Sequence, residues 1–145
     1  MSPDTAVEQV MQREFATVRS DERLDFVDDV MALGRVRHMP VVDDGKLVGV
    51  VSQRDLLAAS LSRVLEFDTQ ERRTFLRSID VREVMAGRPI TVAPSTPLAA
   101  AAALLLRHKI GCLPVVGPAG EAIGLVTERR TSPPGWLASA ATTSA

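Results

Sequence analysis

The sequence predicts an α/β fold made of two β-α-β-β-α units that pack sheet to sheet around a pseudo-twofold axis. The main observation is an internal sequence repeat: several short motifs recur in the same order in the second half of the chain. The repeated pieces are Val10-Met11, Thr17-Val18 and Pro40-Val41-Val42, which return as Val84-Met85, Thr91-Val92 and Pro114-Val115-Val116. A second observation is that each copy places two β-branched runs after a stretch of helical period. A copy of this length is too long for one solenoid turn, and we expect it to bury its apolar face against the other copy.

The first copy opens with a short helical turn at 7–11 and a short strand at 16–18. Apolar residues from Leu24 to Leu33 then recur at helical spacing, which predicts a helix. Ser20 is expected to cap the N-terminus of this helix, and Gly34 is expected to end it.

Two apolar runs, 39–42 and 47–51, follow in the first copy. They are joined by Asp43-Asp44-Gly45-Lys46, and an Asp-Gly pair between two such runs predicts a β-hairpin. The residues from Asp55 to Leu65 continue as an amphipathic helix. The first copy is therefore expected to run turn, strand, helix, hairpin, helix.

The second copy repeats this plan as far as its hairpin. The expected elements are a helix over 99–106 capped by Ser95 or Thr96, and strands over 113–116 and 122–126. Between the copies we expect a short connecting helix at 68–79. Its arginines, Arg72, Arg73 and Arg77, are expected on a solvated face, although they could also bind an acidic partner.

The end of the chain breaks the repeat. Pro133, Pro134 and Gly135 stand close to where the first copy opens its last helix, and they forbid a regular helix there. The second unit is therefore expected to lack its regular last helix. The expected division of the chain is a first repeat at 1–67, the connecting helix at 68–79, a second repeat at 80–130 and an irregular tail at 131–145.

Composition excludes several classes of protein. Aromatic residues are only 3% of the 145 residues, so recognition of nucleic acid by base stacking has little support. Lys plus Arg (17) nearly balances Asp plus Glu (18), which gives no strong field for a polyanion. No apolar run is long enough to span a membrane, and the lone cysteine excludes an internal disulfide. We therefore expect a soluble, cytoplasmic protein that binds neither nucleic acid nor a membrane.

The doubled order of Val-Met, Thr-Val, helix, Pro-Val-Val and Gly-x-Val-Ser/Thr-x-Arg closely resembles a CBS-domain pair, the regulatory module named after cystathionine β-synthase. The resemblance covers residues 7–130. It implies a sensor that binds an adenine nucleotide, most simply AMP, ADP or ATP, in the cleft between its repeats. It also implies a homodimer, no catalytic activity and no required cofactor. S-adenosylmethionine or a cyclic dinucleotide is the weaker alternative for the ligand.

By the same resemblance, the segment from Gly49 to Asp55 carries nucleotide contacts. Ser52 would bond a phosphate and Asp55 would accept hydrogen bonds from the ribose hydroxyls, with Gly49 and Arg54 in the same motif. These roles are chemically reasonable, since a carboxylate accepts two hydroxyls well and a hydroxyl at a helix start can bond an anion.

The remaining carry-overs lie outside this motif. In this family, phosphate-binding cations often precede the Pro-Val-Val strand. Arg35, Arg37 and His38 hold that place in the first copy, and Lys109 holds it in the second. Ala16 and Ile90 would flank the base. In the second copy Thr127 keeps the hydroxyl, but Arg130 replaces the acid and cannot accept a hydrogen bond. We therefore expect one competent nucleotide site.

Simpler readings compete with these roles. Helix capping alone could explain Ser52 and Asp55, and strand bulges could explain Gly49 and Gly124. Cys112 is expected to be a small buried residue rather than a nucleophile, and no metal site is expected. The main alternative function is a ligand-free dimerisation module that recruits a partner protein.

Overall fold

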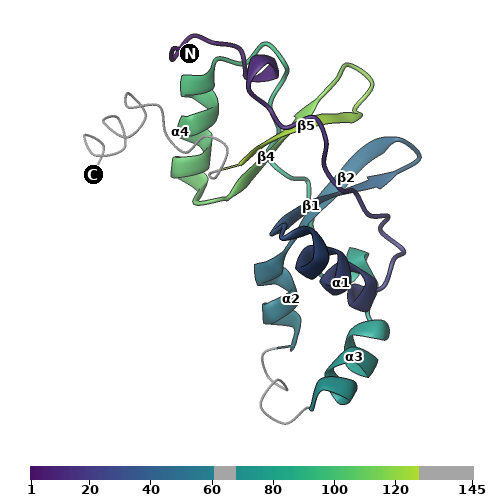
Figure 1. Cartoon of the computed structure of the whole chain (residues 1–145). Coiled ribbons are helices and arrows are strands. Elements are labelled where there is room, and N and C mark those ends of the chain that lie inside the picture. Colours follow the sequence, from purple (N-terminus) through teal and green to yellow (C-terminus); the bar gives the residue numbers. More distant parts are fainter. Residues whose placement is uncertain (61–67, 128–145) are drawn as a thin grey trace. The chain divides into compact units, whose positions relative to one another are not determined.

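The computed structural model describes residues 1–60 and 68–127, and the chain divides into two compact units. One unit is formed by Ala16–Pro89, and the other by Met1–Phe15 together with the chain from Ile90 onward. The four α-helices and the strands of the two hairpins are labelled in Figure 1.

The unit at 16–89 packs three helices beside a small antiparallel sheet of order β1-β2-β3 (Figure 1). Its elements are α1 (Leu24–Gly34), β1 (His38–Asp43), β2 (Lys46–Ser52), α2 (Gln53–Ser60), α3 (Thr69–Arg77), a 3-10 turn (Val81–Glu83) and β3 (Ala86–Gly87). The β1–β2 turn confirms the expected hairpin. Asp44 and Gly45 both take positive φ, 51° and 77°, as a two-residue turn between twisted strands requires.

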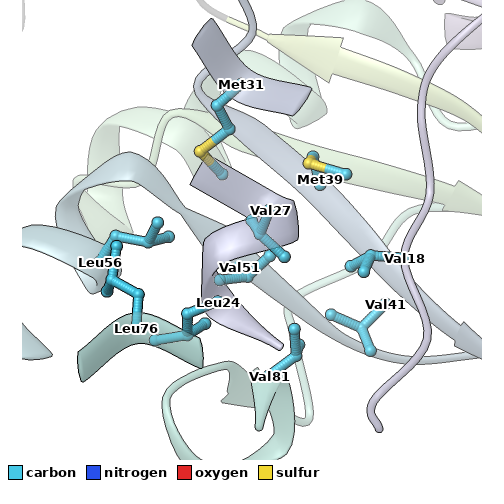
Figure 2. Close-up of a cluster of buried hydrophobic side chains, with 10 residues drawn as sticks. All are labelled: Val18, Leu24, Val27, Met31, Met39, Val41, Val51, Leu56, Leu76 and Val81. Atoms are coloured by element: carbon cyan, nitrogen blue, oxygen red, sulfur yellow. The ribbon is translucent and has the colours of Figure 1, made fainter. Parts of the chain in front are cut away.

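The core of this unit collects side chains from every helix and both long strands. Figure 2 shows Leu24 of α1, Leu56 of α2 and Leu76 of α3 gathered on one side of the hairpin. Leu24 and Leu76 are fully buried. Burying such side chains stabilises the fold by about 1.5–3 kcal/mol each. The helical spacing of the apolar residues in the sequence places them on the helix face that this core buries.

The other unit has one long helix and one hairpin in its described part. Its elements are a 3-10 turn (Val7–Gln9), α4 (Leu98–His108), β4 (Cys112–Val116) and β5 (Ala122–Thr127). Its core includes Val7, Leu98, Leu113 and Val126. The helix and hairpin expected for the second copy are confirmed. The predicted absence of a last helix and the expected irregular tail concern residues outside the described part of the chain.

Each unit contains the opening turn of the opposite sequence copy. The backbone N–H of Val7 donates to the Thr96 carbonyl at 2.9 Å, while that of Val81 donates to the Glu22 carbonyl at 2.8 Å. The Val-Met motif of one copy therefore packs with the helix and hairpin of the other. Met11 and Met85 are packing residues, as expected, since each joins the core of the unit that it enters.

The same exchange explains the two strand glycines. A Cβ on Gly49 would lie 2.7 Å from the Met85 sulfur and 2.9 Å from the Ala86 carbonyl oxygen. Gly124 would meet Met11 in the same way. Glycine is required at both places because the opposite copy's methionine packs directly on the strand.

Several expected helix ends are wrong. Ser20 does not cap α1, because it lies in a turn three residues before the N-cap residue, which is Arg23 and makes no side-chain capping hydrogen bond. The backbone N–H of Ser20 donates instead to the Asp43 carboxylate at 3.0 Å, and its hydroxyl donates to the same group. Gly34 is the last helical residue rather than the stop, since Arg35 adopts the left-handed conformation at φ 52°.

Three further expectations differ from the structure. Pro97 is the N-cap residue of α4, and the Thr96 hydroxyl accepts instead from the Ala93 N–H. The short strand expected at 16–18 is reduced to a single bridge between Val18 and Val41, because only one residue of this stretch runs beside β1. The helix expected from Asp55 begins earlier, at Gln53, and is described as far as Ser60.

Candidate functional site

Most of the expected contact residues lie in the unit at 16–89. They are Ala16, Arg35, Arg37, Gly49, Ser52, Arg54 and Asp55, whereas Thr127 lies in the other unit. The candidate site therefore consists of the β2–α2 junction and the segment that precedes β1.

Ser52 and Asp55 are joined by reciprocal hydrogen bonds at the start of α2. The Ser52 N–H donates to one Asp55 carboxylate oxygen at 2.7 Å, and the Asp55 N–H donates to the Ser52 hydroxyl at 3.1 Å. This arrangement is a capping box, which satisfies two backbone donors at the strand-to-helix junction. The capping interpretation of these two residues is therefore correct as far as the local structure goes.

The capping box leaves chemistry available for a ligand. The Ser52 oxygen accepts one hydrogen bond, so its own proton remains free to donate. In the described chain, the second Asp55 carboxylate oxygen receives no hydrogen bond, and carboxylates accept up to about four. Both side chains are half-buried, so the fold fixes their positions while leaving them accessible.

Arg37 is held next to this junction through its backbone. The Gln53 N–H, one residue before Arg54, donates to the Arg37 carbonyl at 2.9 Å. His38, the next residue, pairs with Ser52 in the β1–β2 register. The segment at 35–37 and the first turn of α2 are therefore neighbours in space, although they are distant in the sequence.

The arginines at this junction are exposed and not used by the fold. Within residues 1–60 and 68–127, Arg35, Arg37 and Arg54 take part in no ion pair. An unpaired guanidinium offers a planar set of donors that matches a phosphate. Arg54 in the first turn of α2 and Arg37, whose carbonyl accepts from Gln53, make this junction suitable for an anion.

Two other residues predicted to contact the nucleotide, Ala16 and Gly49, lack such polar groups in their side chains. Ala16 is exposed, and Gly49 is buried beneath Met85. Close packing is enough to explain the glycine, and its role in a ligand site stays a prediction, as does that of Ala16.

The second unit presents a weaker version of the same junction. Thr127 ends β5 as Ser52 ends β2, and Lys109 follows α4 in the left-handed conformation, as Arg35 follows α1. Gly111, however, stands where the first copy has Arg37. Arg130, which replaces the acid, lies outside the described residues. The second copy thus keeps two of the three cations in its sequence, Lys109 and Arg129, and of these only Lys109 lies among the described residues.

Other reactive groups are accounted for by packing. Cys112 is 6% exposed, and burial raises the pKa of its thiol to about 12, so it is a buried residue rather than a nucleophile. Among the described residues, no cluster of His, Cys, Asp and Glu could hold a metal ion. In the same part of the chain, no helix is both long and apolar enough to cross a bilayer.

The arginines of α3 are partly exposed, as the sequence predicts, but each is paired with an aspartate of α1. Arg72 and Arg73 each make two hydrogen bonds to an aspartate of α1, Asp28 and Asp29 respectively. The physical reason is that α1 offers carboxylates three and four residues apart on one face. The spacing of these acids, and of the arginines on α3, was a signal in the sequence that could have been used.

Comparison with known proteins identifies the family. The family model for the CBS domain matches residues 7–62 and 81–130. A CBS domain-containing protein of Dictyostelium discoideum is 34% identical over 122 residues, which cover 83% of this chain and 84% of the relative.

Two further similarities bear on function. The solved structure of CBSX2 in complex with AMP aligns with a TM-score of 0.72 and 30% identity, covering 95% of this chain and 96% of that one. Inosine-5′-monophosphate dehydrogenase of Korarchaeum cryptofilum is 31% identical over 122 residues, but the match covers 84% of this chain and only 22% of the enzyme. The repeated motifs, the two similar units and these matches agree: the chain is a pair of CBS domains and belongs to the CBS domain family.

Proposed function

We propose that this CBS-domain pair is a regulatory sensor that binds an adenine nucleotide, AMP, ADP or ATP, and catalyses no reaction. The observation that carries the proposal is the Ser52–Asp55 pair at the start of α2, with unpaired arginines beside it. The similarity to CBSX2, whose structure holds AMP, supports the same ligand class. The cytoplasm, where a lone thiol stays reduced, is the proposed compartment.

The proposed roles follow from the chemistry of each group. The unbonded Asp55 oxygen accepts a ribose hydroxyl, a hydrogen bond that a deoxyribose cannot fully replace. The Ser52 hydroxyl and the guanidinium groups of Arg37 and Arg35 donate to the phosphate. Binding regulates only if the nucleotide prefers one arrangement of the protein, because a ligand shifts an equilibrium by its difference in affinity.

The test is calorimetric titration with AMP, ADP, ATP and S-adenosylmethionine. Asp55→Asn retains an acceptor for the Ser52 N–H but removes the charge, while Asp55→Ala removes both. We expect both changes to weaken nucleotide binding by about 1–3 kcal/mol, because each removes a charge-assisted hydrogen bond. Only Asp55→Ala should also lower the stability, by about 0.5–2 kcal/mol through the lost cap.

Asp21→Asn is the control, since Asp21 is an exposed carboxylate that pairs with Arg19 elsewhere in the same unit. It should leave affinity unchanged. Unchanged affinity in Asp55→Asn would remove Asp55 from the site. Absence of binding by any of the four ligands would contradict the nucleotide-sensor proposal.

The second candidate is a dimerisation or protein-interaction module, and one observation favours it. Phe26 and Leu33, seven residues apart on one face of α1, are 47% and 87% exposed, and Leu57 of α2 is 52% exposed. We propose that this surface pairs two copies of the chain in a homodimer. Leu33→Glu should then give a monomer in analytical ultracentrifugation, and a dimer that persists in this variant would contradict the use of this surface.

A further inference from the structure

The helix α3 is docked on α1 by a ladder of three ion pairs. Arg72 pairs with Asp28 at 2.9 Å, Arg73 with Asp29 at 2.8 Å and Arg77 with Asp25 at 3.2 Å. Every basic residue of α3 takes part. Asp25 precedes Asp28 and Asp29 in α1, whereas its partner Arg77 follows Arg72 and Arg73 in α3. The contact therefore depends on the register of both helices.

The apolar part of this docking comes mainly from one residue. Leu76 is the only fully buried side chain of α3, and Phe75 is half-buried against the same core. The paired arginine side chains remain 31%, 36% and 61% exposed, so water and salt reach them. Charge therefore carries a larger share of the contact for α3 than for α1 or for the hairpin.

Such a contact responds to ionic strength. The screening length falls from about 30 Å at 0.01 M salt to about 3 Å at 1 M, which weakens exposed pairs strongly and backbone hydrogen bonds little. A helix of nine residues is not stable alone in water, so α3 loses its helical hydrogen bonds when it leaves α1. The antiparallel pairing of β1 with β2 has no such dependence.

We propose that α3 is an electrostatic latch, which salt releases from α1 while the hairpin and α1 stay folded. Release uncovers the acidic face formed by Asp25, Asp28 and Asp29. It also removes Leu76 from its place beside Leu56 of α2, the helix whose first turn carries Asp55 (Figure 2). The latch is a property of this unit and does not depend on any ligand.

Hydrogen–deuterium exchange of the full chain at about 0.02 M and about 1 M sodium chloride tests the proposal. Amides of 72–77 should exchange at least about tenfold faster at high salt, while those of β1 and β2 keep their protection. Arg72→Gln combined with Arg73→Gln should give the fast exchange already at low salt. Arg19→Gln, which removes an ion pair within a loop, is the matched control and should have no effect on α3.

A charge exchange separates electrostatics from helix propensity. Asp28→Arg alone should release α3 at low salt, and Asp28→Arg with Arg72→Asp should restore its protection. The latch is disproved if protection of α3 is independent of salt, or if α3 and the hairpin lose protection together. Failure of the exchanged pair to restore protection would equally overturn it.

Discussion

The two compact units share an apolar core but differ in the polar contacts around it. Leu24 of α1 and Leu98 of α4 are equally buried, at 0% and 1% exposure, and both hairpins carry a register shift after the same valine, at Val41 and Val115. Two sets of polar contacts in the first of these units have no counterpart among the described residues of the other. The unit at 16–89 joins Ser20 to Asp43 and adds the α1–α3 ladder, whereas Pro94 and Gly117 stand where the first pair would be.

This difference separates the residues that build the fold from those that could bind a ligand. Buried valines, leucines and strand glycines recur in both units because either unit needs them to pack. Asp55 and Arg37 have no counterpart of the same kind, since Arg130 and Gly111 replace them. The proposed nucleotide site therefore consists of polar residues that only one unit has, and we expect one site per chain.

The largest effects should come from the shared apolar core. Leu24→Ala and Leu98→Ala should each lower the free energy of unfolding by about 2–5 kcal/mol, because each leaves a cavity in a closed core. Urea unfolding measures both. A cost below about 1 kcal/mol for either variant would break the equivalence of the two cores.

The strand glycines should follow with smaller costs. Gly49→Ala and Gly124→Ala should each destabilise the protein by about 1–3 kcal/mol, since the added methyl group meets the opposite copy's methionine. Gly87→Ala is the control, because a Cβ there has no heavy atom within 4 Å. If all three variants had the same melting temperature, the close packing described here would be wrong.

A change at Arg37 sharpens the contrast between the units. Arg37→Gly gives the first unit the residue that the second has at Gly111, and it should weaken nucleotide binding by about three- to tenfold. The stability should stay within about 0.5 kcal/mol, because the side chain is exposed and unpaired in the described chain. Calorimetry and thermal unfolding report the two quantities separately. Unchanged affinity would exclude Arg37 from the site.

The left-handed residues after α1 and α4 allow a matched comparison. Arg35 and Lys109 both have φ 52°, a conformation that glycine adopts more easily than other residues. Arg35→Gly and Lys109→Gly should each stabilise the protein by about 0.5–1 kcal/mol. Only Arg35→Gly should also lower the affinity for the nucleotide. A loss of stability in both variants would show that the basic side chains contribute more than the backbone strain costs.

The smallest expected effect is on the stability of the β1–β2 hairpin at low pH. The hydroxyl and the N–H of Ser20 hold the pKa of Asp43 below its usual value of 3.8. A lowered pKa in the folded state contributes stability above the usual value, and this stability is lost as the pH falls through the lowered one. Below about pH 4 the β1–β2 hairpin should therefore lose exchange protection before β4–β5 does. Ser20→Ala should remove this difference, and identical acid sensitivity of the two hairpins in the wild type would argue against it.

The fold was largely predictable because it depends on apolar periodicity and turn chemistry. The two hairpins, α1, α4 and the opening turns all follow from such patterns, and the repeated motifs made the family recognisable. The ends of the helices were not predictable from the local sequence. Ser20 had the right residue type for a cap, but the Asp43 carboxylate, distant in the sequence, offers it a better partner.

The candidate site was predictable only in part. The Ser52–Asp55 motif is local, and the sequence showed it directly. The backbone contact between Gln53 and Arg37 and the ion pairs of α3 join segments that are far apart in the chain, so they required the folded structure. The exchange of opening turns between copies was equally invisible, because the same motif occurs in both.

The central claim is that one of the two similar units carries a competent nucleotide site. Native mass spectrometry of the intact protein with saturating AMP, and separately with ATP, counts the bound nucleotides per chain. We expect one bound nucleotide per chain, and a lower bound fraction in Asp55→Ala at the same nucleotide concentration. Two nucleotides per chain would show that the second unit binds despite Arg130 and Gly111, and no bound nucleotide with either ligand would contradict the account of the site.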